Sequence, residues 1–588
     1  MSVNLLAFIE EIQELYVNGT VYESYVAKLK TKDELRMIRA SAAVRSPSRL
    51  REYLQNGTTC NEGLVLSCRG LTNTQVEHVE DEIKFYKLLS ANAADGELPG
   101  GVDMVWVNND ARDSELAKGF KRNAAMLEKD CVRVCFPNAK DGPVGLLGVL
   151  DPFLYSFSAE KSLLLKKPTI SPEEALNFAS PRTKPGSVAN WNQAINRYNK
   201  SMASDYDTPF DMREISSLTQ AHDMSKADKY SCWLPTDFYV NEDGSVTICS
   251  FINNLHPIQY ADLYKSISKV FAKFVPLLEQ VATDVLHPPK PRAVFDKEDW
   301  YVPNMLHPDA LIEMVKQDKP VPEEYQQFVT TSSAYCYGGQ GNSTLRVKDM
   351  ELDMTALYKA WEATMARVRP ATLPFSTPDR PIEPYIVRGL PLQASVEMVS
   401  IFLTPENSRI SEQRWQAVGR AEERIFAVGL YFYDVENFSR APIKFRDPVV
   451  GKVFNDSHEM QKFCSSFKVY GDETRESEYS QEVGEIEVVN GQYICYPNLY
   501  QTKMPYFKLA DSTKPGHAKF IAFHIADPTT RLISTAVVPP LQPSWAKSTE
   551  IDESVLVCKE AEEFKDAYES HSQCVEKRFN VRLSLRDE

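Results

Sequence analysis

The chain has no long hydrophobic run and no long run of basic residues, and both absences limit what it can do. Over its 588 residues, no apolar stretch approaches the roughly 20 residues that a helix needs to cross a bilayer. The formal net charge of −15 argues against a general affinity for nucleic-acid phosphates or anionic lipid surfaces. We therefore expect neither a nucleic-acid partner nor a membrane partner.

The first residues also lack the features of a targeting signal. The stretch MSVNLLAFIEEIQELYVNGT has no basic leader and carries three glutamates. The 11 cysteines are scattered without zinc-knuckle spacing, which is typical of reduced thiols in a protein core. Together these features predict a cytoplasmic protein.

Two common catalytic motifs are missing as well. The chain contains no Gly-x-Ser-x-Gly nucleophile motif and no phosphate-binding loop of the Walker type. The acidic pairs Glu422/Glu423 and Glu323/Glu324 are interpreted as solvated surface, where charged side chains usually lie. None of these features points to a hydrolase or a nucleotide-binding enzyme.

What is present is an ordinary globular composition, with 43% hydrophobic and 25% charged residues. Two proline-rich stretches, HPPKPRAVF and PATLPFSTPDRPIEP, indicate boundaries between parts of the chain. We predict an α+β region over 1–290, a proline-rich connector with a helix over 291–380, a β-rich domain over 381–550 and a carboxy-terminal helix over 551–588. The polar stretch 165–230 is interpreted as a surface excursion.

Apolar periodicity changes from helical in the first two thirds to strand-like in the last third. Helical spacing predicts helices within 1–90, over 261–285 and over 350–368, and CWLPTDFYVNEDGSVTICSFINNLHP predicts a hairpin. The candidate strands after residue 380 are Gln393–Leu403, Ile425–Tyr433, Ile443–Phe445, Gly484–Val489, Gln492–Tyr496, Tyr506–Leu509 and Lys519–Ile525. Seven short strands separated by turns predict a sandwich or a jelly-roll barrel.

Several long phrases resemble a fungal family known only as domain-of-unknown-function family forty-two forty-six. They keep the family's order over about 130–550 and include CWLPTDFYV, SFINNLHP, LYFYDVENF, YPNLYQ, LADSTKPGHAKF and DPTTRLISTAVVPPLQPSW. The resemblance implies a double-stranded β-helix, or jelly-roll barrel, similar to that of 2-oxoglutarate/Fe(II) oxygenases. A family-specific amino-terminal region would precede this barrel.

Oxygenases of that type hold ferrous iron with two imidazoles and one carboxylate. The resemblance implies ligands in the pattern Trp-His-x-Glu-Gly, a second His after the Gln of Pro-Asn-x-x-Gln, and an Arg after Gly-His for the cosubstrate. This chain has Gln416 and Val418 at the first two ligand positions, Thr502 at the third and Ala518 at the Arg position. We therefore expect no metal and no cofactor in this barrel.

Other positions depart from the family in the same region. Glu397 and Ser400 stand where the family has Lys and Asn, and Asp151 stands where it has His. Of the nine histidines, His517 and His524 are close in sequence, but seven residues apart on one strand they would face opposite sides of a sheet. They are interpreted as hydrogen-bonded structural histidines.

Aromatic residues are concentrated on the candidate strand that follows the first ligand positions. Alternation places Tyr431 and Tyr433 on one side of that strand and Phe432 on the other. These rings can serve ordinary core packing, or they can line an aromatic, metal-free cavity for a small apolar molecule. The sequence leaves both interpretations open.

The leading hypothesis is an oxygenase-like protein without iron chemistry that binds a small apolar molecule. In it, the altered barrel catalyses a redox-neutral cyclisation or isomerisation in fungal specialised metabolism. The candidate pocket residues are Gln416, Val418, Tyr431, Tyr433, Thr502, Ala518 and Glu397. Two alternatives stay open: a non-catalytic pseudoenzyme scaffold with a protein partner, and an active 2-oxoglutarate-dependent oxygenase whose Fe(II) ligands are unidentified.

Overall fold

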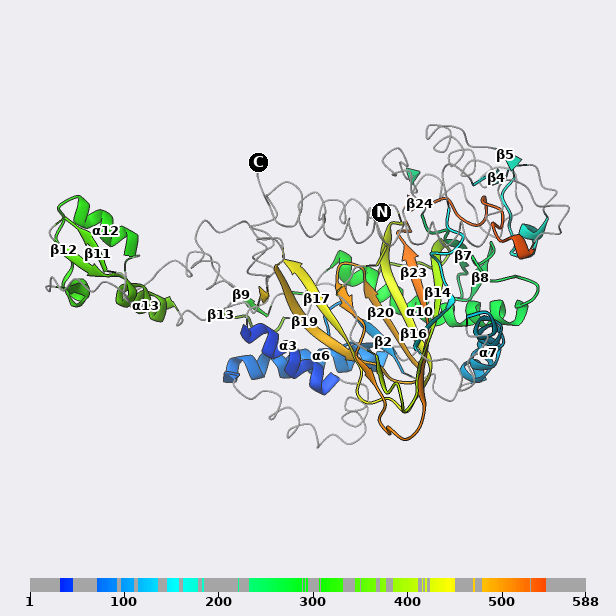
Figure 1. The fold of residues 1–588 in the computed structure, drawn as a ribbon, viewed down its shortest axis with the longest axis horizontal. Coiled ribbons are helices and arrows are strands. Elements are labelled where there is room, and N and C mark those ends of the chain that lie inside the picture. The colour runs from blue at the N-terminus through cyan, green and yellow to red at the C-terminus, as the bar shows by residue number, and fades with distance from the viewer. Residues whose placement is uncertain are drawn as a thin grey trace. The chain divides into compact units, whose positions relative to one another are not determined.

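The computed structural model of the chain divides into two compact units (Figure 1). Met1–Lys290 and Phe375–Glu588 form the main unit, and Pro291–Pro374 form the second. The structure describes residues 32–45, 71–92, 97–109, 115–135, 145–157, 162–165, 167–177, 182–183, 220–221, 232–287, 289–290, 292–294, 306, 308–330, 344–348, 350–365, 371–376, 384–410, 415, 418–419, 423–449, 469–470, 479–528 and 530–545. The expected helices before residue 32 and over 551–588, and most of the excursion 165–230, lie outside these ranges.

A large antiparallel sheet organises the main unit. Its strands follow the order β1-β2-β20-β16-β23-β14-β7-β8, and β3 also pairs with β14. The strands are β1 (Glu97–Pro99), β2 (Trp106–Asn108), β3 (Gly145–Leu150), β7 (Thr236–Val240), β8 (Val246–Ile248), β14 (Pro391–Leu403), β16 (Ile425–Glu436), β20 (Gln492–Pro497) and β23 (Gly516–Ala526). The centre of the sheet is therefore β16, β23 and β14, three long strands rich in Val, Ile, Phe and Tyr, which favour extended backbone.

A smaller sheet packs on one face of the large sheet. Its order is β18-β19-β17-β21, with β17 (Pro442–Val449), β18 (Val469–Tyr470), β19 (Tyr479–Glu487) and β21 (Gln501–Lys503). Side chains from both sheets, such as Val399 and Ile401 on β14 with Ile443 and Phe445 on β17, form one buried cluster. We call the space that they fill the inter-sheet core.

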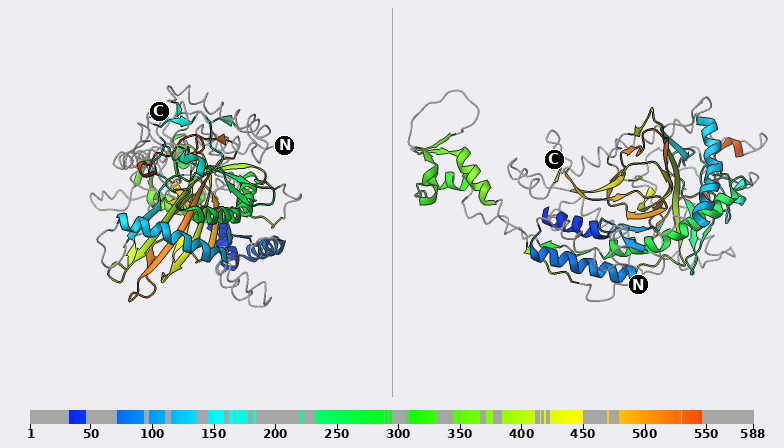
Figure 2. Two further views of the ribbon diagram at one scale, coloured as in Figure 1. Left: turned by 90° about the vertical axis from the view of Figure 1, so that its right-hand side faces the viewer. Right: turned by 90° about the horizontal axis from the view of Figure 1, so that it is seen from below.

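Helices cover the opposite face of the large sheet (Figure 2). Helix α10 (Ala261–Leu286) turns an apolar stripe to the strands, including the completely buried Phe271 and Phe274, and α7 (Glu115–Cys135) packs beside it. Gly429 on β16 has no side chain, and a Cβ placed there would lie 2.8 Å from Cδ1 of Phe274. The helix can therefore approach the sheet closely at this point.

Two further helices of the main unit, α3 (Lys32–Arg45) and α6 (Asn73–Asn92), pack on each other through Met37, Ala40, Val79 and Ile83. The short elements of this unit are η1 (Glu173–Leu176), η5 (Pro543–Trp545) and the paired strands β4 (Leu164–Leu165) with β5 (Arg182–Thr183), β6 (Gln220–Ala221) with β24 (Thr530–Arg531), and β15 (Arg409–Ile410) with β22 (Phe507–Lys508).

The second unit has its own core of Leu311, Tyr325, Leu352 and Leu357. It contains α12 (Pro308–Lys316), η3 (Glu323–Phe328), α13 (Met354–Met365) and the strands β10 (Val329–Thr330), β11 (Thr344–Val347) and β12 (Met350–Asp353). Its two ends are paired, because β9 (Ala293–Val294) lies antiparallel to β13 (Ala371–Thr372). In the main unit, Lys290 Nζ lies 3.1 Å from Ser376 Oγ, so the chain leaves and re-enters that unit at one place.

The predicted α+β class is confirmed. The hairpin is present as β7 and β8, the helix over 261–285 is α10, and the seven predicted strands overlap β14, β16, β17, β19, β20, β22 and β23. The helix predicted over 350–368 begins only at Met354, because Met350–Asp353 pairs with β10 and β11 as a strand. The strands that the structure describes form no closed barrel, so the jelly roll stays a prediction.

The ranges 1–290 and 381–550 share one sheet and one core. Strand β2 pairs with β20, while β3 and β7 pair with β14, and α10 packs on all of these through the same cluster. Sequence patterning did not predict this, because strand pairing across hundreds of residues leaves no local signal. None of the described helices combines the length and the apolar composition that crossing a bilayer requires.

Candidate functional site

The position of Val418, where the resemblance implies an iron ligand, lies at the edge of the inter-sheet core. Val418 is half-buried there, while Gln416 lies outside the described residues. The Val418 N–H donates to Asn498 Oδ1 at 3.1 Å, and its carbonyl accepts from Asn498 Nδ2 at 2.8 Å. Asn498 Nδ2 also donates to the Ile425 carbonyl at 3.1 Å, so this one amide fixes the segment that leads into β16.

Thr502 and Ala518 face the same inter-sheet core. Thr502 lies buried on β21 and hydrogen-bonds the hydroxyl of Tyr496, and burial raises the pKa of Tyr496 so that its hydroxyl stays protonated. Ala518 is completely buried on β23, where it pairs with Ile401 on one side and Val435 on the other. These positions hold packed, neutral side chains.

The donor atoms at these positions do not fit ferrous iron. Val418 carries no donor atom, the single Thr502 oxygen is engaged with Tyr496, and Ala518 lacks the charge that the cosubstrate Arg would supply. Within the described ranges, no group of three or more His, Cys, Asp and Glu side chains is placed to hold a metal ion. We therefore derive no step through iron.

Tyr431 and Tyr433 lie on the other face of the sheet, under the helices. Tyr431 stacks on Tyr493 with ring centroids 4.1 Å apart, and Tyr433 packs edge-on against Phe120 of α7 at 5.0 Å. Phe432 points into the inter-sheet core, as the alternation predicts. The six candidate pocket residues that the structure describes are thus not brought together: the two tyrosines belong to the packing beneath α7 and α10.

Glu397 has a partner that the sequence did not predict. Its Oε2 lies 3.0 Å from Nε2 of His524, and both residues face the inter-sheet side of the large sheet. They come from neighbouring strands, β14 and β23, where His524 pairs with Ser395 and Glu397 with Ala522. A register between strands 127 residues apart cannot be read from local spacing, so the pair was missed.

His517 lies on the opposite face of β23, as its spacing from His524 predicts. Its Nε2 is 2.9 Å from Asp434 Oδ2, and Lys121 of α7 lies 2.7 Å from Asp434 Oδ1. Burial alone would raise the pKa of Asp434, but the hydrogen bonds from His517 and Lys121 outweigh it and lower that pKa. The two histidines lie on opposite faces of β23 as predicted: His524 is hydrogen-bonded to Glu397, and His517 lies within ion-pair distance of Asp434.

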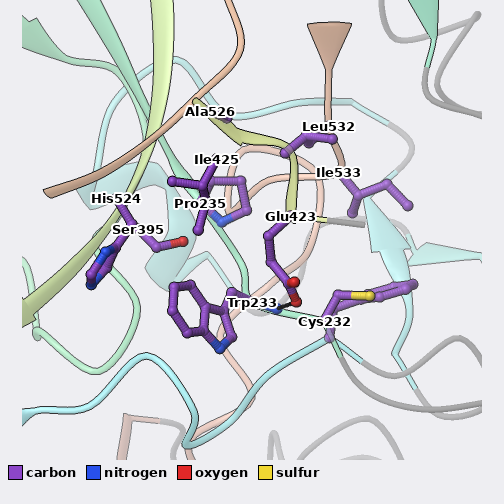
Figure 3. A pocket seen from close by; sticks show the side chains of 11 residues that line it. Cys232, Trp233, Pro235, Ser395, Glu423, Ile425, His524, Ala526, Leu532 and Ile533 are labelled. Carbon is purple, nitrogen blue, oxygen red and sulfur yellow. Dashed lines mark hydrogen bonds between the residues drawn. The ribbon is translucent and has the colours of Figure 1, made fainter. Parts of the chain in front are cut away.

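A recess opens beside His524 at one end of the inter-sheet core (Figure 3). Its empty volume of about 420 Å³ includes the open solvent at its mouth, and the centres of water-sized molecules can occupy only about 20 Å³ of it. Its lining is mainly apolar, formed by Phe157, Trp233, Pro235, Ile425, Ala526, Leu532 and Ile533. The polar lining residues are Cys232, Ser395, Glu423 and His524. A concave, mainly apolar site with a few polar groups is the usual form of a small-molecule site.

Glu423 corrects an expectation, because it is not on a solvated face. It is only 4% exposed, it lines the recess, and its Oε1 accepts the backbone N–H of Trp233 at 3.4 Å. It directly precedes β16, and the turn through Arg424, which has a positive φ of 49°, separates it from the strand. The sequence showed an acidic pair but not this turn, and Glu422 lies outside the described residues.

One wall of the recess is a turn that the phrase SFINNLHP holds in place. Phe157 pairs with Cys232 in an isolated β-bridge, and Phe153 packs edge-on against Trp233 with ring centroids 4.9 Å apart. Asn253 Nδ2 donates to the carbonyls of Leu154 and Tyr155 at 3.1 and 3.2 Å. This amide therefore fixes the wall that carries Phe157.

Asp151, at the start of the same turn, is a capping residue in this chain. Its Oδ1 accepts the backbone N–H of Phe153 at 2.9 Å, and its carbonyl accepts from Asn254 Nδ2 at 2.7 Å. The departure from the family's His at this position thus leaves the turn intact. Two neighbouring asparagines, Asn253 and Asn254, anchor it from the same phrase.

The recess joins an apolar surface to a buried imidazole that is held by a carboxylate. The His524 ring lies 5.1 Å from the Trp233 ring, and Figure 3 shows the Ser395 hydroxyl between them and Ile425. Such a site can bind a neutral apolar molecule and can take up or give back one proton. Nothing in this arrangement requires a redox step.

The comparisons with known proteins give a family and no established activity. None of the curated proteins matches the chain. Two solved structures are similar over part of it: a selenomethionine-labelled Fe(II)/(alpha)ketoglutarate-dependent dioxygenase TqaL, at 7% identity and TM-score 0.14 over 29% of this chain and 52% of that chain, and IDO from Bacillus thuringiensis, at 8% identity and TM-score 0.14 over 40% of this chain and 88% of that chain. The chain thus spans about half the length of the dioxygenase, and TM-scores this low carry no argument. The family described as "Protein of unknown function (DUF4246)" matches residues 78–549, and the chain belongs to that family.

Proposed function

We propose that this protein binds a small, mainly apolar molecule in the recess beside His524 and acts on it without iron chemistry. The fold in this proposal is a jelly-roll type related to that of 2-oxoglutarate/Fe(II) oxygenases, remodelled at the ligand positions. The reaction class is a redox-neutral cyclisation or isomerisation, as part of fungal specialised metabolism.

The observation that carries the proposal is the recess itself. Seven apolar side chains line it, and one polar group inside it, His524, is 5% exposed and bonded to a carboxylate. Burying an apolar molecule against such a lining contributes roughly 25 cal/mol per Å² of apolar surface removed from water. The lack of a donor atom at Val418 supports the part of the proposal that excludes iron, and Ala518 lacks the charge that would bind the cosubstrate carboxylate.

Ligand binding is tested with para-nitroanisole, a neutral aromatic probe, on the full chain. Wild-type protein is expected to bind it, measured by equilibrium dialysis, and Ile533→Trp is expected to abolish binding by filling the recess. Leu146→Trp is the matched control, because Leu146 is 50% exposed on β3 and does not line the recess. Equal binding by all three proteins would refute the recess as the binding site.

Iron chemistry is tested separately. Protein incubated anaerobically with ferrous iron and then dialysed is expected to retain less than one equivalent of metal. It is also expected to yield no succinate from 2-oxoglutarate in air. Retention of a full equivalent together with succinate would favour the working oxygenase. Failure of the folded wild-type protein to bind the apolar probe would favour the scaffold.

A further inference from the structure

His524 presents an unsatisfied acceptor inside the protein. Its Nε2 lies 3.0 Å from Glu397 Oε2, and its buried Nδ1 has no hydrogen-bond partner. Because an ionised carboxylate only accepts hydrogen bonds, Nε2 carries the proton, which leaves the Nδ1 lone pair available. Leaving a buried acceptor unsatisfied costs free energy, so a ligand that donates a hydrogen bond to Nδ1 from the neighbouring recess would be stabilised there.

The surroundings of the imidazole restrict the charge of that ligand. Four titratable groups are placed near it: Glu397 on β14, Glu423 before β16, Cys232 on the bridge to the wall turn, and Tyr496 on β20. Neither Lys nor Arg occurs among the described residues that line the recess. Among these described residues a carboxylate such as 2-oxoglutarate would find no counter-ion, whereas a neutral hydrogen-bond donor fits the Nδ1 acceptor.

Resting on the proposed function, we propose that the ligand carries an acidic hydroxyl, a phenol or an enol, and that His524 takes its proton. In this step the O–H bond breaks, its electron pair stays on oxygen, and the proton goes to Nδ1. Nε2 keeps its proton toward Glu397, whose negative charge stabilises the imidazolium. Return of the proton to a carbon of the same molecule completes an isomerisation in which nothing is oxidised or reduced.

The proposed base, the His524 imidazole, determines which hydroxyl groups can give up a proton to it. A phenol has a pKa of about 10, and a neutral imidazole is a base that can accept its proton across a direct hydrogen bond. An aliphatic alcohol is far less acidic and would remain protonated beside the same group. Trp233, with its ring 5.1 Å from that of His524, offers an apolar surface for an aromatic or conjugated skeleton.

The test compares para-nitrophenol with its methyl ether para-nitroanisole on the full chain. Wild-type protein is expected to bind the phenol as its phenolate, seen as the phenolate absorption band at a pH where the free phenol is still protonated. The ether should bind without any spectral change. His524→Phe, which keeps the ring volume, should remove the band and weaken phenol binding about tenfold or more, while ether binding is unchanged.

Two further variants make the result specific. His517→Phe changes the other histidine of β23, which faces Asp434 on the opposite side of the sheet, and should leave both probes unaffected. Glu397→Gln keeps an acceptor for Nε2–H but removes the charge, so the phenolate band should appear only at higher pH. This variant also tests the inference if His524→Phe does not fold.

The outcomes separate the two proposals. If the ether binds but the phenol shows no shift, or if the shift survives His524→Phe, then the proton-accepting role is refuted while ligand binding stands. The same shift in Glu397→Gln and in wild type would refute the role of the carboxylate. If neither probe binds the wild-type protein, the proposed function fails together with this inference.

Discussion

Replacing Gly429 by alanine tests how closely α10 lies on the large sheet. An added Cβ would lie 2.8 Å from Cδ1 and 2.9 Å from Cε1 of Phe274, distances that real Cβ atoms essentially never show. The Phe274 ring cannot simply turn away, because it packs against Tyr493 at 5.2 Å and Phe523 at 5.4 Å between ring centroids. Helix, ring or strand must therefore shift.

The expected loss follows from the two opposing effects of the substitution. Forcing one extra carbon into a well-packed core costs about 1–3 kcal/mol. Alanine also lowers the conformational entropy of the unfolded chain relative to glycine, which stabilises the folded state by about 0.4–1 kcal/mol. Gly429→Ala should therefore lower the free energy of unfolding by roughly 1–2 kcal/mol, measured as a lower urea midpoint by circular dichroism.

The double variant Gly429→Ala/Phe274→Leu identifies the cause. The smaller, flexible leucine makes room for the new methyl group, so the two effects should be less than additive by about 0.5–3 kcal/mol. Gly119→Ala in α7 is the control, since a Cβ there meets nothing within 4 Å and should stabilise the helix by about 0.5–1 kcal/mol. A neutral Gly429→Ala, or strict additivity with Phe274→Leu, would refute the close approach.

Two other substitutions probe partly buried polar groups. Burial raises the pKa of Asp284 to about 7, and Trp106 Nε1 donates to its Oδ2 at 2.7 Å. Between pH values of about 4 and about 7, Asp284 then holds a proton in the folded state that it has lost in the unfolded state. The free energy of unfolding should therefore fall as pH rises through this range. Asp284→Asn should remove that fall, measured as urea midpoints at several pH values. Asn498→Ala should lower the free energy of unfolding by about 1–3 kcal/mol, because the backbone groups of Val418 and Ile425 lose their hydrogen-bond partner. Asn498→Asp, whose side chain can only accept, should have a urea midpoint between those of Asn498→Ala and wild type. A wild-type midpoint for both variants would contradict the anchoring role of Asn498.

Local chemistry made much of the fold predictable. The hairpin over β7 and β8 follows from a polar turn containing Gly244 between two apolar stretches, and Gly244 has the positive φ of 81° that such turns need. Alternation placed Tyr431 and Phe432 on opposite faces of β16. These features depend on residues close in sequence, so single-strand periodicity was sufficient.

Predictions that depended on long-range pairing were incomplete. The sequence could not show that Tyr431 faces α7 and α10 while Thr502 and Ala518 face the smaller sheet, because the choice of face depends on which layers cover each side. For the same reason it treated His524 and Glu397 as unrelated residues. The sequence thus identified some residues of the candidate site, but their arrangement in space depends on the register between strands.

The pairing of β9 with β13 has a consequence for how the chain was assembled. The second unit begins and ends in adjacent strands, and Lys290 and Ser376 are within hydrogen-bonding distance at the corresponding point of the main unit. Excising the segment between them would leave ends that one or two residues can join, with a small loss of loop-closure entropy. The segment therefore has the form of an exchangeable insertion, which can be gained, lost or replaced while the sheet and the recess stay unchanged.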